Sequence, residues 1–231
     1  MESIVIATTK EWNMSNYFKL KERYNEKYTF FLITNNEELN KKKLDSINPK
    51  YIFFPHWSWI ISENIYQNFE CVVFHMTDLP YGRGGSPLQN LIIREIYDTK
   101  ISAIKVSSGI DTGDMYLKEN FNISLGSAEE IFIQLSKIIF NKMIPRFLDT
   151  ILVAKPQKGD TVVFKRRKPD ESNLLTLENF QLYKIYDFIR MLDAEGYPKA
   201  YIDMNNLKIE FSEVHMKNNK LIGKFEVKEN E

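Results

Sequence analysis

Short, uninterrupted runs of apolar residues recur through the N-terminal two thirds of the chain, and helix-length segments separate them. The runs are Ser3 to Thr8, Tyr28 to Thr34, Tyr51 to Phe54, Val72 to Met76, Ile101 to Val106 and Met115 to Phe121. Strands that read as continuous apolar runs are typically buried on both faces. The alternation of such strands with helices predicts an α/β fold, in which a mostly parallel sheet is covered by helices on both sides.

The segments between these runs carry signals of helices, which we expect at residues 13–24, 37–44, 57–66, 86–97 and 127–148. Ser86 followed by Pro87 is a typical start of a helix, because serine caps the first turn and proline fits its first position. Ser127, with Glu129 and Glu130 in the first turn, is a second such start.

The pattern changes after Lys155. Residues 155–169 are polar and basic, and a helix is expected at residues 179–192 beyond them. Strands are expected near residues 200–204, 207–211 and 221–227, after a turn at Gly196-Tyr197-Pro198. We therefore predict two domains: residues 1–155, and a small α+β domain at residues 156–231 that is rich in strands and has one helix.

Composition narrows the class of protein. Lys and Arg together number 31, as do Asp and Glu, so the formal net charge is zero. This balance argues against binding to nucleic acid by bulk attraction to phosphates. Cys71 is the only cysteine and lies in an apolar run, which fits a buried thiol in a reducing compartment. No signal peptide and no membrane-spanning apolar run is recognised, so a soluble, cytoplasmic protein without membrane contact is expected.

The loops that follow the strands are where such a sheet binds ligands. The first strand leads into Thr8 and Thr9 without a glycine-rich phosphate loop, which argues against a bound dinucleotide. The fourth run ends at His75, and Asp111 follows the next run. If the two meet at the sheet edge, the carboxylate would orient the imidazole for proton transfer near neutral pH. A histidine with a nearby aspartate is more often structural, so this pair alone leaves both interpretations open.

Two motifs make the pair more specific. Residues 73–87 align without a gap with the pattern Asn-x-His-x-Ser-Leu-Leu-Pro-x-x-x-Gly-x-x-Pro, with differences at residues 73, 77 and 78. Residues 111–114 match Asp-x-Gly-Asp. On these residues, the chain resembles the superfamily of methionyl-tRNA formyltransferases and glycinamide ribonucleotide formyltransferases. Residues 190–201 are also similar to a stretch in the C-terminal domain of the tRNA and sugar enzymes of that superfamily. The chain most closely resembles the sugar N-formyltransferases of that superfamily.

The resemblance implies a Rossmann-like formyltransferase domain at residues 1–155 that transfers a formyl group from 10-formyltetrahydrofolate, a reduced folate. The implied acceptor is the primary amine of a nucleotide-linked amino sugar, in a pathway of glycan biosynthesis. His75 would be the general base and acid, Asp111 would orient it, and no metal is expected. A homodimer is also expected, since such enzymes often pair and the second domain is rich in aromatic residues.

The resemblance also implies which loops bind the two substrates. The folate pocket would be lined by His56, Trp57, Trp59, Ile60, Gly109 and Ile110. Tryptophan walls suit a flat pterin ring, although Trp57 and Trp59 fit a hydrophobic core equally well. Arg83 suits a pyrophosphate, because its guanidinium binds anions in a bidentate manner. Other substrate contacts are expected on the same loop, at Asp78, Tyr81 and Gly84.

One departure from the family pattern bears directly on the chemistry. Valine stands at residue 73, where the family has an asparagine that hydrogen-bonds the formyl oxygen. Loss of one such donor typically costs about 10²–10³ in rate. Protonated His75 would be one substitute, and His56, Gln89 or a backbone N–H of Gly84-Gly85 would be another. The remaining explanation is an inactive protein that only binds folate or sugar.

Three other activities fit the sequence less well. A formyltetrahydrofolate hydrolase would use the same pair with water, but such enzymes usually carry a regulatory domain. A tRNA formyltransferase is disfavoured by the length of 231 residues and by the neutral charge. The second domain disfavours a glycinamide ribonucleotide enzyme.

Overall fold

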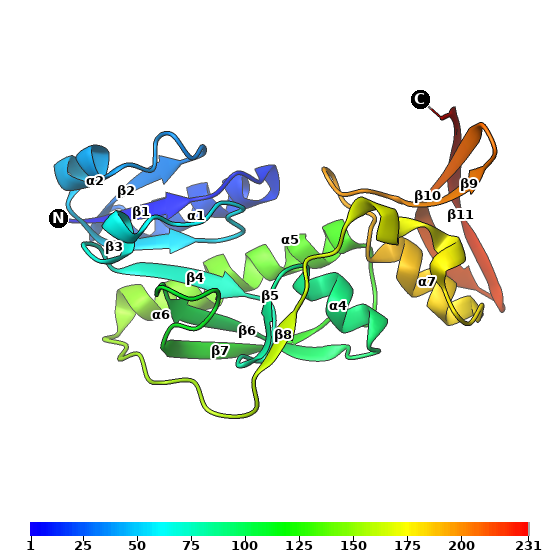
Figure 1. Cartoon of the computed structure of the whole chain (residues 1–231). Coiled ribbons are helices and arrows are strands. Elements are labelled where there is room, and N and C mark those ends of the chain that lie inside the picture. The colour runs from blue at the N-terminus through cyan, green and yellow to red at the C-terminus, as the bar shows by residue number, and fades with distance from the viewer. Residues whose placement is uncertain (231) are drawn as a thin grey trace. The chain divides into compact units, whose positions relative to one another are not determined.

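The computed structural model describes residues 1–230 (Figure 1). Its residues group into two compact units that interleave along the chain. Unit 1 comprises residues 1–83, 100–121 and 133–163, and unit 2 comprises residues 84–99, 122–132 and those from Phe164 onward. Residues 84–99 and 122–132 thus group with the C-terminal segment, whereas the sequence placed them in the first domain. The division into domains 1–155 and 156–231 stays a prediction.

Six strands form the main sheet, in the order β2-β1-β3-β4-β6-β7. These strands are β1 (Glu2–Ala7), β2 (Tyr28–Ile33), β3 (Pro49–Phe54), β4 (Cys71–His75), β6 (Asp98–Lys105) and β7 (Met115–Asn122). β1 runs parallel to β2 and β3, and β3 runs parallel to β4. β6 runs antiparallel to β4, and Ser102 lies opposite His75. The mostly parallel α/β sheet is therefore confirmed, with an antiparallel step beside the strand that carries His75.

The two faces of this sheet are covered by different helices of unit 1. Phe53 contacts Phe147 of α6 (Ile144–Asp149) on one face, with ring centroids 5.2 Å apart. Its neighbour Phe54 points to the other face and packs in an apolar cluster with Leu44 of α2 (Lys41–Ile47) and Ile65 of α3 (Glu63–Tyr66). Neighbouring strand residues point to opposite faces, so an uninterrupted apolar run is what a sheet covered on both sides requires.

The helices confirm most of the expected segments, with shifted ends. The remaining helices are α1 (Met14–Tyr24), α4 (Pro87–Ile93), α5 (Ala128–Ile138) and α7 (Leu182–Arg190), together with short 3₁₀ segments at Glu11–Asn13, Pro169–Ser172 and Leu174–Thr176. α2 begins after Asn40, whose side chain caps it, so the expected helix at residues 37–44 was placed too early. α4 ends before Glu95, whose positive φ of 57° is incompatible with a helix.

Two expected helices were wrong in extent. Residues 57–62 are not helical, and α3 begins only after Ser62, because Ile60 is exposed and gives an earlier start no face to bury. The expected helix at residues 127–148 contains a π-helical turn at Ile139–Met143, directly before α6. Pro145, at the start of α6, has no backbone N–H to continue a regular helix, which accounts for the change.

In unit 2, β9 (Ala200–Met204), β10 (Leu207–Lys217) and β11 (Lys220–Glu229) form an antiparallel sheet in the order β11-β10-β9. α7 lies against this sheet and packs on β10 (Figure 1). Arg190, at the end of α7, is buried, and it donates hydrogen bonds to Asp187 and to the carbonyls of Ile123 and Gly126. The expected strand-rich segment with one main helix is confirmed.

Two short strands were not expected from the sequence. β5 (Tyr81–Gly84) and β8 (Val162–Phe164) form a two-stranded sheet, and the boundary between the units passes through both strands. Among residues 1–230, no helix combines the length and the apolar character that crossing a bilayer requires.

Candidate active site

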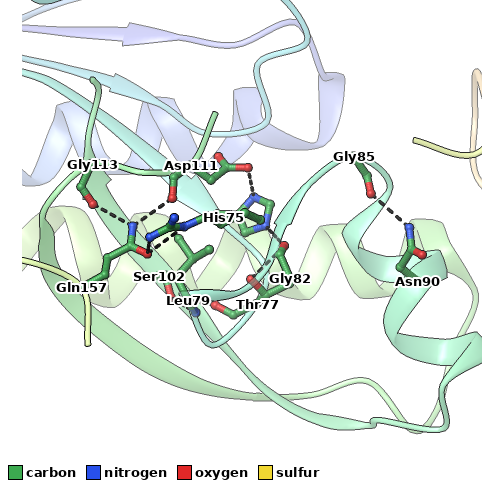
Figure 2. A network of polar contacts seen from close by, with 11 residues as sticks. His75, Thr77, Leu79, Gly82, Gly85, Asn90, Ser102, Asp111, Gly113 and Gln157 are labelled. Atoms are coloured by element: carbon green, nitrogen blue, oxygen red, sulfur yellow. Dashed lines mark hydrogen bonds and ion pairs between the residues drawn. The ribbon is translucent and has the colours of Figure 1, made fainter. Parts of the chain in front are cut away.

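His75 ends β4 and is only 8% exposed. Its Nε2 atom lies 2.7 Å from the carbonyl oxygen of Gly82, and its Nδ1 atom lies 3.4 Å from Oδ2 of Asp111 (Figure 2). A carbonyl oxygen and a carboxylate oxygen only accept hydrogen bonds. The ring therefore satisfies both contacts only when each nitrogen carries a proton. The histidine and the aspartate that the two motifs single out are thus brought together.

The route by which Asp111 reaches His75 differs from the expected one. Because β6 is antiparallel to β4, its carboxyl end lies at the opposite end of β4, where the N–H of Val106 bonds the carbonyl of Cys71. The loop at residues 106–114 then carries Asp111 back to the histidine. Asp111 adopts a positive φ of 54°, which aspartate tolerates better than most residues.

Gly113 allows this loop to close. A Cβ atom at Gly113 would lie 1.6 Å from the carbonyl oxygen of Lys105, so no larger residue fits there. The N–H of Lys105 bonds the carbonyl of Asp114 at 2.9 Å and fixes the base of the loop. The glycine of the Asp-x-Gly-Asp motif thus has a steric role in placing the aspartate.

Gln157 lies against the Asp111 loop (Figure 2) and joins it to Arg83. Its Nε2 donates to the carbonyls of Asp111 (2.9 Å) and Gly113 (2.7 Å). Its Oε1 accepts from Nε (3.2 Å) and Nη2 (2.8 Å) of Arg83. Gln157 was not predictable from the sequence, because a single glutamine in a polar linker carries no signal that distinguishes it from a solvated residue.

Two further polar residues hold the turn after β4, and sequence reasoning also missed them. Ser102 donates to the carbonyl of Thr77 at 2.7 Å and accepts from the N–H of Leu79 at 3.4 Å. Thr77 in turn lies 3.4 Å from the Gly82 carbonyl. The signal that was available is a serine inside the apolar run at residues 101–106, where a buried hydroxyl needs a partner.

The residues predicted to bind the acceptor have different surroundings. Asp78 pairs with Lys118 (2.5 Å) and Lys100 (3.0 Å). Burial alone would raise the pKa of Asp78, but these two lysines outweigh burial and hold the pKa below its usual value. Tyr81 and Arg83 lie on β5, and Gln157 joins Arg83 to the Asp111 loop. The acceptor role of Asp78 and Tyr81 stays a prediction.

Gly84 lies in unit 2, where its φ is +102° and an added Cβ would lie 2.5 Å from the carbonyl oxygen of Phe164. A glycine is therefore needed there for close approach of two backbone segments. This packing explains the residue without a substrate, and its predicted substrate contact stays a prediction.

The residues predicted to line the folate pocket lie on two loops of unit 1. Trp57 and Trp59 contact each other edge to face, with ring centroids 4.9 Å apart, and Trp59 and Ile60 are exposed. His56 has a positive φ of 58°, and burial, with a smaller contribution from Lys10, lowers its pKa to about 4. Gly109 and the exposed Ile110 belong to the Asp111 loop. Their folate contacts stay predictions.

Val73 lies on the same face of β4 as His75, because residues two apart on a strand point the same way. It packs against the apolar cluster of unit 1 and offers no hydrogen-bond donor. Gln89, named above as a substitute donor, is buried in unit 2 and donates to the carbonyl of Met191 at 2.9 Å. The packing and hydrogen bonding of unit 2 thus explain why Gln89 is buried.

A cavity in unit 1 does not coincide with these residues. Its volume is about 560 Å³, and its lining contains none of the predicted site residues; the lining is Lys50, Tyr51, Glu70, Lys105, Asp114, Tyr116, Leu152, Val153 and Ala154. Within residues 1–230, no group of three or more His, Cys, Asp or Glu side chains is arranged to hold a metal ion.

Comparison with known proteins gives consistent matches. A family model described as the C-terminal domain of methionyl-tRNA formyltransferase matches residues 169–228. The methionyl-tRNA formyltransferase of Rickettsia africae is 26% identical over 197 residues, which cover 83% of this chain and 63% of that relative. The chain therefore spans less than two thirds of the length of the curated relatives it matches.

Solved structures extend the comparison. Two distant ones show the same fold: HypX from Aquifex aeolicus in complex with tetrahydrofolic acid, and a sugar N-formyltransferase from Shewanella. HypX is 13% identical with a TM-score of 0.71, covering 94% of this chain and 39% of HypX. The Shewanella enzyme is 14% identical with a TM-score of 0.69, covering 97% and 96% of the two chains.

A third solved structure is much more similar. The methionyl-tRNA formyltransferase from Clostridium thermocellum is 55% identical, with a TM-score of 0.96, and the match covers 100% of both chains. Identity at this level over whole chains shows the relationship directly. This chain belongs to the methionyl-tRNA formyltransferase family of one-carbon transferases.

Proposed function

We propose that this protein transfers a formyl group from 10-formyltetrahydrofolate to a primary amine. The observation that carries the proposal is the contact between Nδ1 of the buried His75 and Oδ2 of Asp111, at 3.4 Å. A carboxylate beside a histidine stabilises the charge that the ring acquires when it accepts a proton. The family relationship supplies the class of reaction, and the pair supplies the group that moves the proton.

In the proposed mechanism, the nitrogen of the acceptor amine attacks the formyl carbon and forms a C–N bond. His75 accepts the proton that the amine loses. The tetrahedral intermediate then breaks its bond to N10 of the folate, and the leaving nitrogen receives a proton from His75. Tetrahydrofolate and the N-formylated acceptor are the products, and the histidine returns to its initial state. Asp111 stays ionised throughout and orients the ring.

The geometry sets one requirement for this cycle. Nε2 of His75 is engaged with the carbonyl of Gly82 at 2.7 Å. That contact must be exchanged for one with the amine, since Nδ1 faces Asp111. His75 then acts from Nε2, and the Gly82 carbonyl defines the position that the acceptor nitrogen must occupy.

The aromatic loop after β3 suits the folate. Nε1 of Trp57 is buried and has no hydrogen-bond partner among the described residues. Such a donor costs roughly 1–3 kcal/mol while unpaired, so a bound ring that offers an acceptor atom would relieve that cost. The neighbouring ring of Trp59 is partly exposed and offers an apolar surface to a flat heterocycle.

Two acceptors compete. The name of the relative that is 55% identical over both whole chains favours the amino group of methionyl-tRNA. The net charge of zero favours a small acceptor such as a nucleotide-linked amino sugar, because tRNA binding usually relies on a basic surface. We propose methionyl-tRNA as the acceptor to test first, and the amino sugar second.

The test is to incubate the protein with 10-formyltetrahydrofolate and three acceptor sets: methionyl-tRNA, a panel of nucleotide-linked amino sugars, and no acceptor. Tetrahydrofolate release and the acceptor mass are followed together. A gain of one formyl group on an acceptor supports transfer and identifies its class. Folate release without an acceptor supports the hydrolase instead. Folate binding without turnover in any arm supports a binding protein and overturns the proposal.

A further inference from the structure

A closed circuit of polar contacts surrounds the His75–Asp111 pair. It runs from Nε2 of His75 to the carbonyl of Gly82, through the next peptide bond to Arg83, and from the Arg83 guanidinium to Gln157. Gln157 donates to the Asp111 carbonyl, and the Asp111 carboxylate returns to Nδ1 of His75. Figure 2 shows Gln157, Asp111, His75 and Gly82 in this arrangement.

Within this circuit, the side-chain amide of Gln157 is used completely. Each amide hydrogen reaches a different carbonyl, and the oxygen accepts from two nitrogens of the same guanidinium. A side-chain amide has two donor hydrogens and one oxygen with two lone pairs. Four satisfied contacts from one partly buried side chain are unusual for a residue whose only role is to keep a linker soluble.

The two carbonyls that Gln157 binds flank the most constrained part of the Asp111 loop. Asp111 has a left-handed backbone, and the site of Gly113 has no room for a side chain. Sparsely populated backbone conformations cost about 1–3 kcal/mol and persist only when surrounding contacts fix them. The two hydrogen bonds from Gln157 are such contacts, and they determine where the Asp111 carboxylate points.

On its other side, Gln157 holds Arg83. Two N–H groups of the guanidinium point to the same oxygen, which fixes the plane of the cation. A guanidinium has five N–H donors, so three remain for an anionic group of a substrate or for the oxygen that becomes negative during transfer. Residue 73 supplies no donor for that oxygen, so the Arg83 guanidinium could replace the missing hydrogen bond.

We propose that Gln157 is a positioning residue of the formyl-transfer site, which fixes the backbone at Asp111 and holds the Arg83 guanidinium beside it. The inference rests on the proposed function. Gln157 touches no reacting atom and acts through its two neighbours. Because Gln157 lies in the linker after α6, its hydrogen bonds connect that linker to the Asp111 loop.

Two substitutions separate the two halves of this role. Gln157→Glu keeps an acceptor for Arg83 but removes the donors to Asp111 and Gly113. Gln157→Lys keeps a donor for these carbonyls but removes the acceptor and places a second cation beside Arg83. We expect each change to lower kcat about 10- to 100-fold, because small displacements of catalytic groups have effects of this size. The KM for the folate should change less than about threefold, since the aromatic loop is not altered.

A measurement that does not need activity accompanies the kinetics. Hydrogen exchange of the amides at residues 107–113 should be faster in Gln157→Glu than in the wild type, because the loop loses two hydrogen bonds. Gln181→Glu, an exposed residue before α7, serves as the matched control and should leave both exchange and kcat unchanged.

The outcomes separate this inference from the proposed function. Unchanged exchange in Gln157→Glu, or kcat within twofold of the wild type in both variants, overturns the positioning role. Faster exchange together with the loss of kcat supports it. If the wild type transfers no formyl group, the proposed function fails, and the exchange result alone decides whether Gln157 holds the loop.

Discussion

At the scale of single residues, two neighbouring oxygen atoms limit the hydrogen bonds that the His75 ring can form. Gly82 presents a carbonyl and Asp111 a carboxylate, so neither can donate a proton to the ring. A neutral ring can donate to only one of these two oxygens, so the ring that accepts the proton in the proposed cycle has given up the Gly82 contact. The pairing of His75 with Asp111 was predictable from the two sequence motifs, but its route was not, because the carboxyl end of β6 lies away from His75. The Gly82 contact was not, since it depends on a turn that Ser102 and Thr77 hold.

The carboxylate of Asp111 is testable by a nearly isosteric change. Asp111→Asn removes the negative charge that stabilises the protonated ring, and we expect kcat to fall about 10²- to 10⁴-fold, the range of general acid–base catalysis. Formyl transfer at saturating folate is the measurement, with a thermal melt to verify folding. Asp203→Asn, an exposed residue on β9, is the control. A kcat of Asp111→Asn within threefold of the wild type would contradict the assigned role.

The half-buried His56 predicts a pH dependence of stability. Burial lowers its pKa in the folded state to about 4, from an ordinary value of 6.5. Between these values the unfolded chain binds the proton more readily, so the contribution of His56 to stability is present above pH 6.5 and is lost as the pH falls toward 4. The loss is on the order of 2–3 kcal/mol. Denaturant unfolding of the wild type and His56→Gln at pH 7 and pH 4.5 checks this. Equal losses in both proteins would count against it.

At the scale of elements, the apolar runs predicted the strands of the main sheet because each strand is buried on both faces. The direction of β6 was not predictable, since an apolar run reads the same in a parallel and an antiparallel strand. Some helix ends were not predicted. These helices end near residues with a left-handed backbone, such as Glu95 and Asn48, and the residue type alone does not predict that conformation. β5 is short and contains two glycines, and the three apolar residues of β8 are too few to stand out from the linker.

The loop between β6 and β7 offers a prediction at this scale. Gly113→Ala would place a Cβ atom 1.6 Å from the carbonyl oxygen of Lys105, so the backbone must move. The displacement carries Asp111 with it, and we expect kcat to fall at least about 10²-fold. Ser108→Ala, an exposed residue of the same loop, should retain activity and is the matched control. Comparable rates of transfer in the two variants would show that the position of the loop is unimportant.

At the scale of the whole molecule, segments far apart in the sequence build each unit. Residues 84–99 and 122–132 group with the C-terminal residues, and Tyr97 donates a hydrogen bond to Asp187 within unit 2. The sequence indicated the change of composition after Lys155 but not this interleaving. The composition of a segment does not indicate which distant residues it contacts, so a pair such as Tyr97 and Asp187 could not be predicted from it. The acceptor amine depends on surfaces that the motifs do not describe.

The buried cation of unit 2 is a test of how that unit is held together. Arg190 is 1% exposed and pairs with Asp187 at 2.6 Å. Arg190→Met removes the ion pair to Asp187 and the donor to two carbonyls, and we expect a loss of about 3–5 kcal/mol in the free energy of unfolding. Denaturant unfolding measures this, with Lys19→Met, an exposed residue of α1, as the control. Equal stability of the two variants would refute this role.

The central claim is that the imidazole of residue 75 moves the proton during formyl transfer, and one rate comparison tests it most directly. Single-turnover transfer from 10-formyltetrahydrofolate is measured for the wild type, His75→Ala, and His215→Ala, whose exposed histidine lies on β10. The account predicts a fall of about 10²- to 10⁴-fold for His75→Ala, with folate binding retained, and a wild-type rate for His215→Ala. A His75→Ala rate within threefold of the wild type would contradict it.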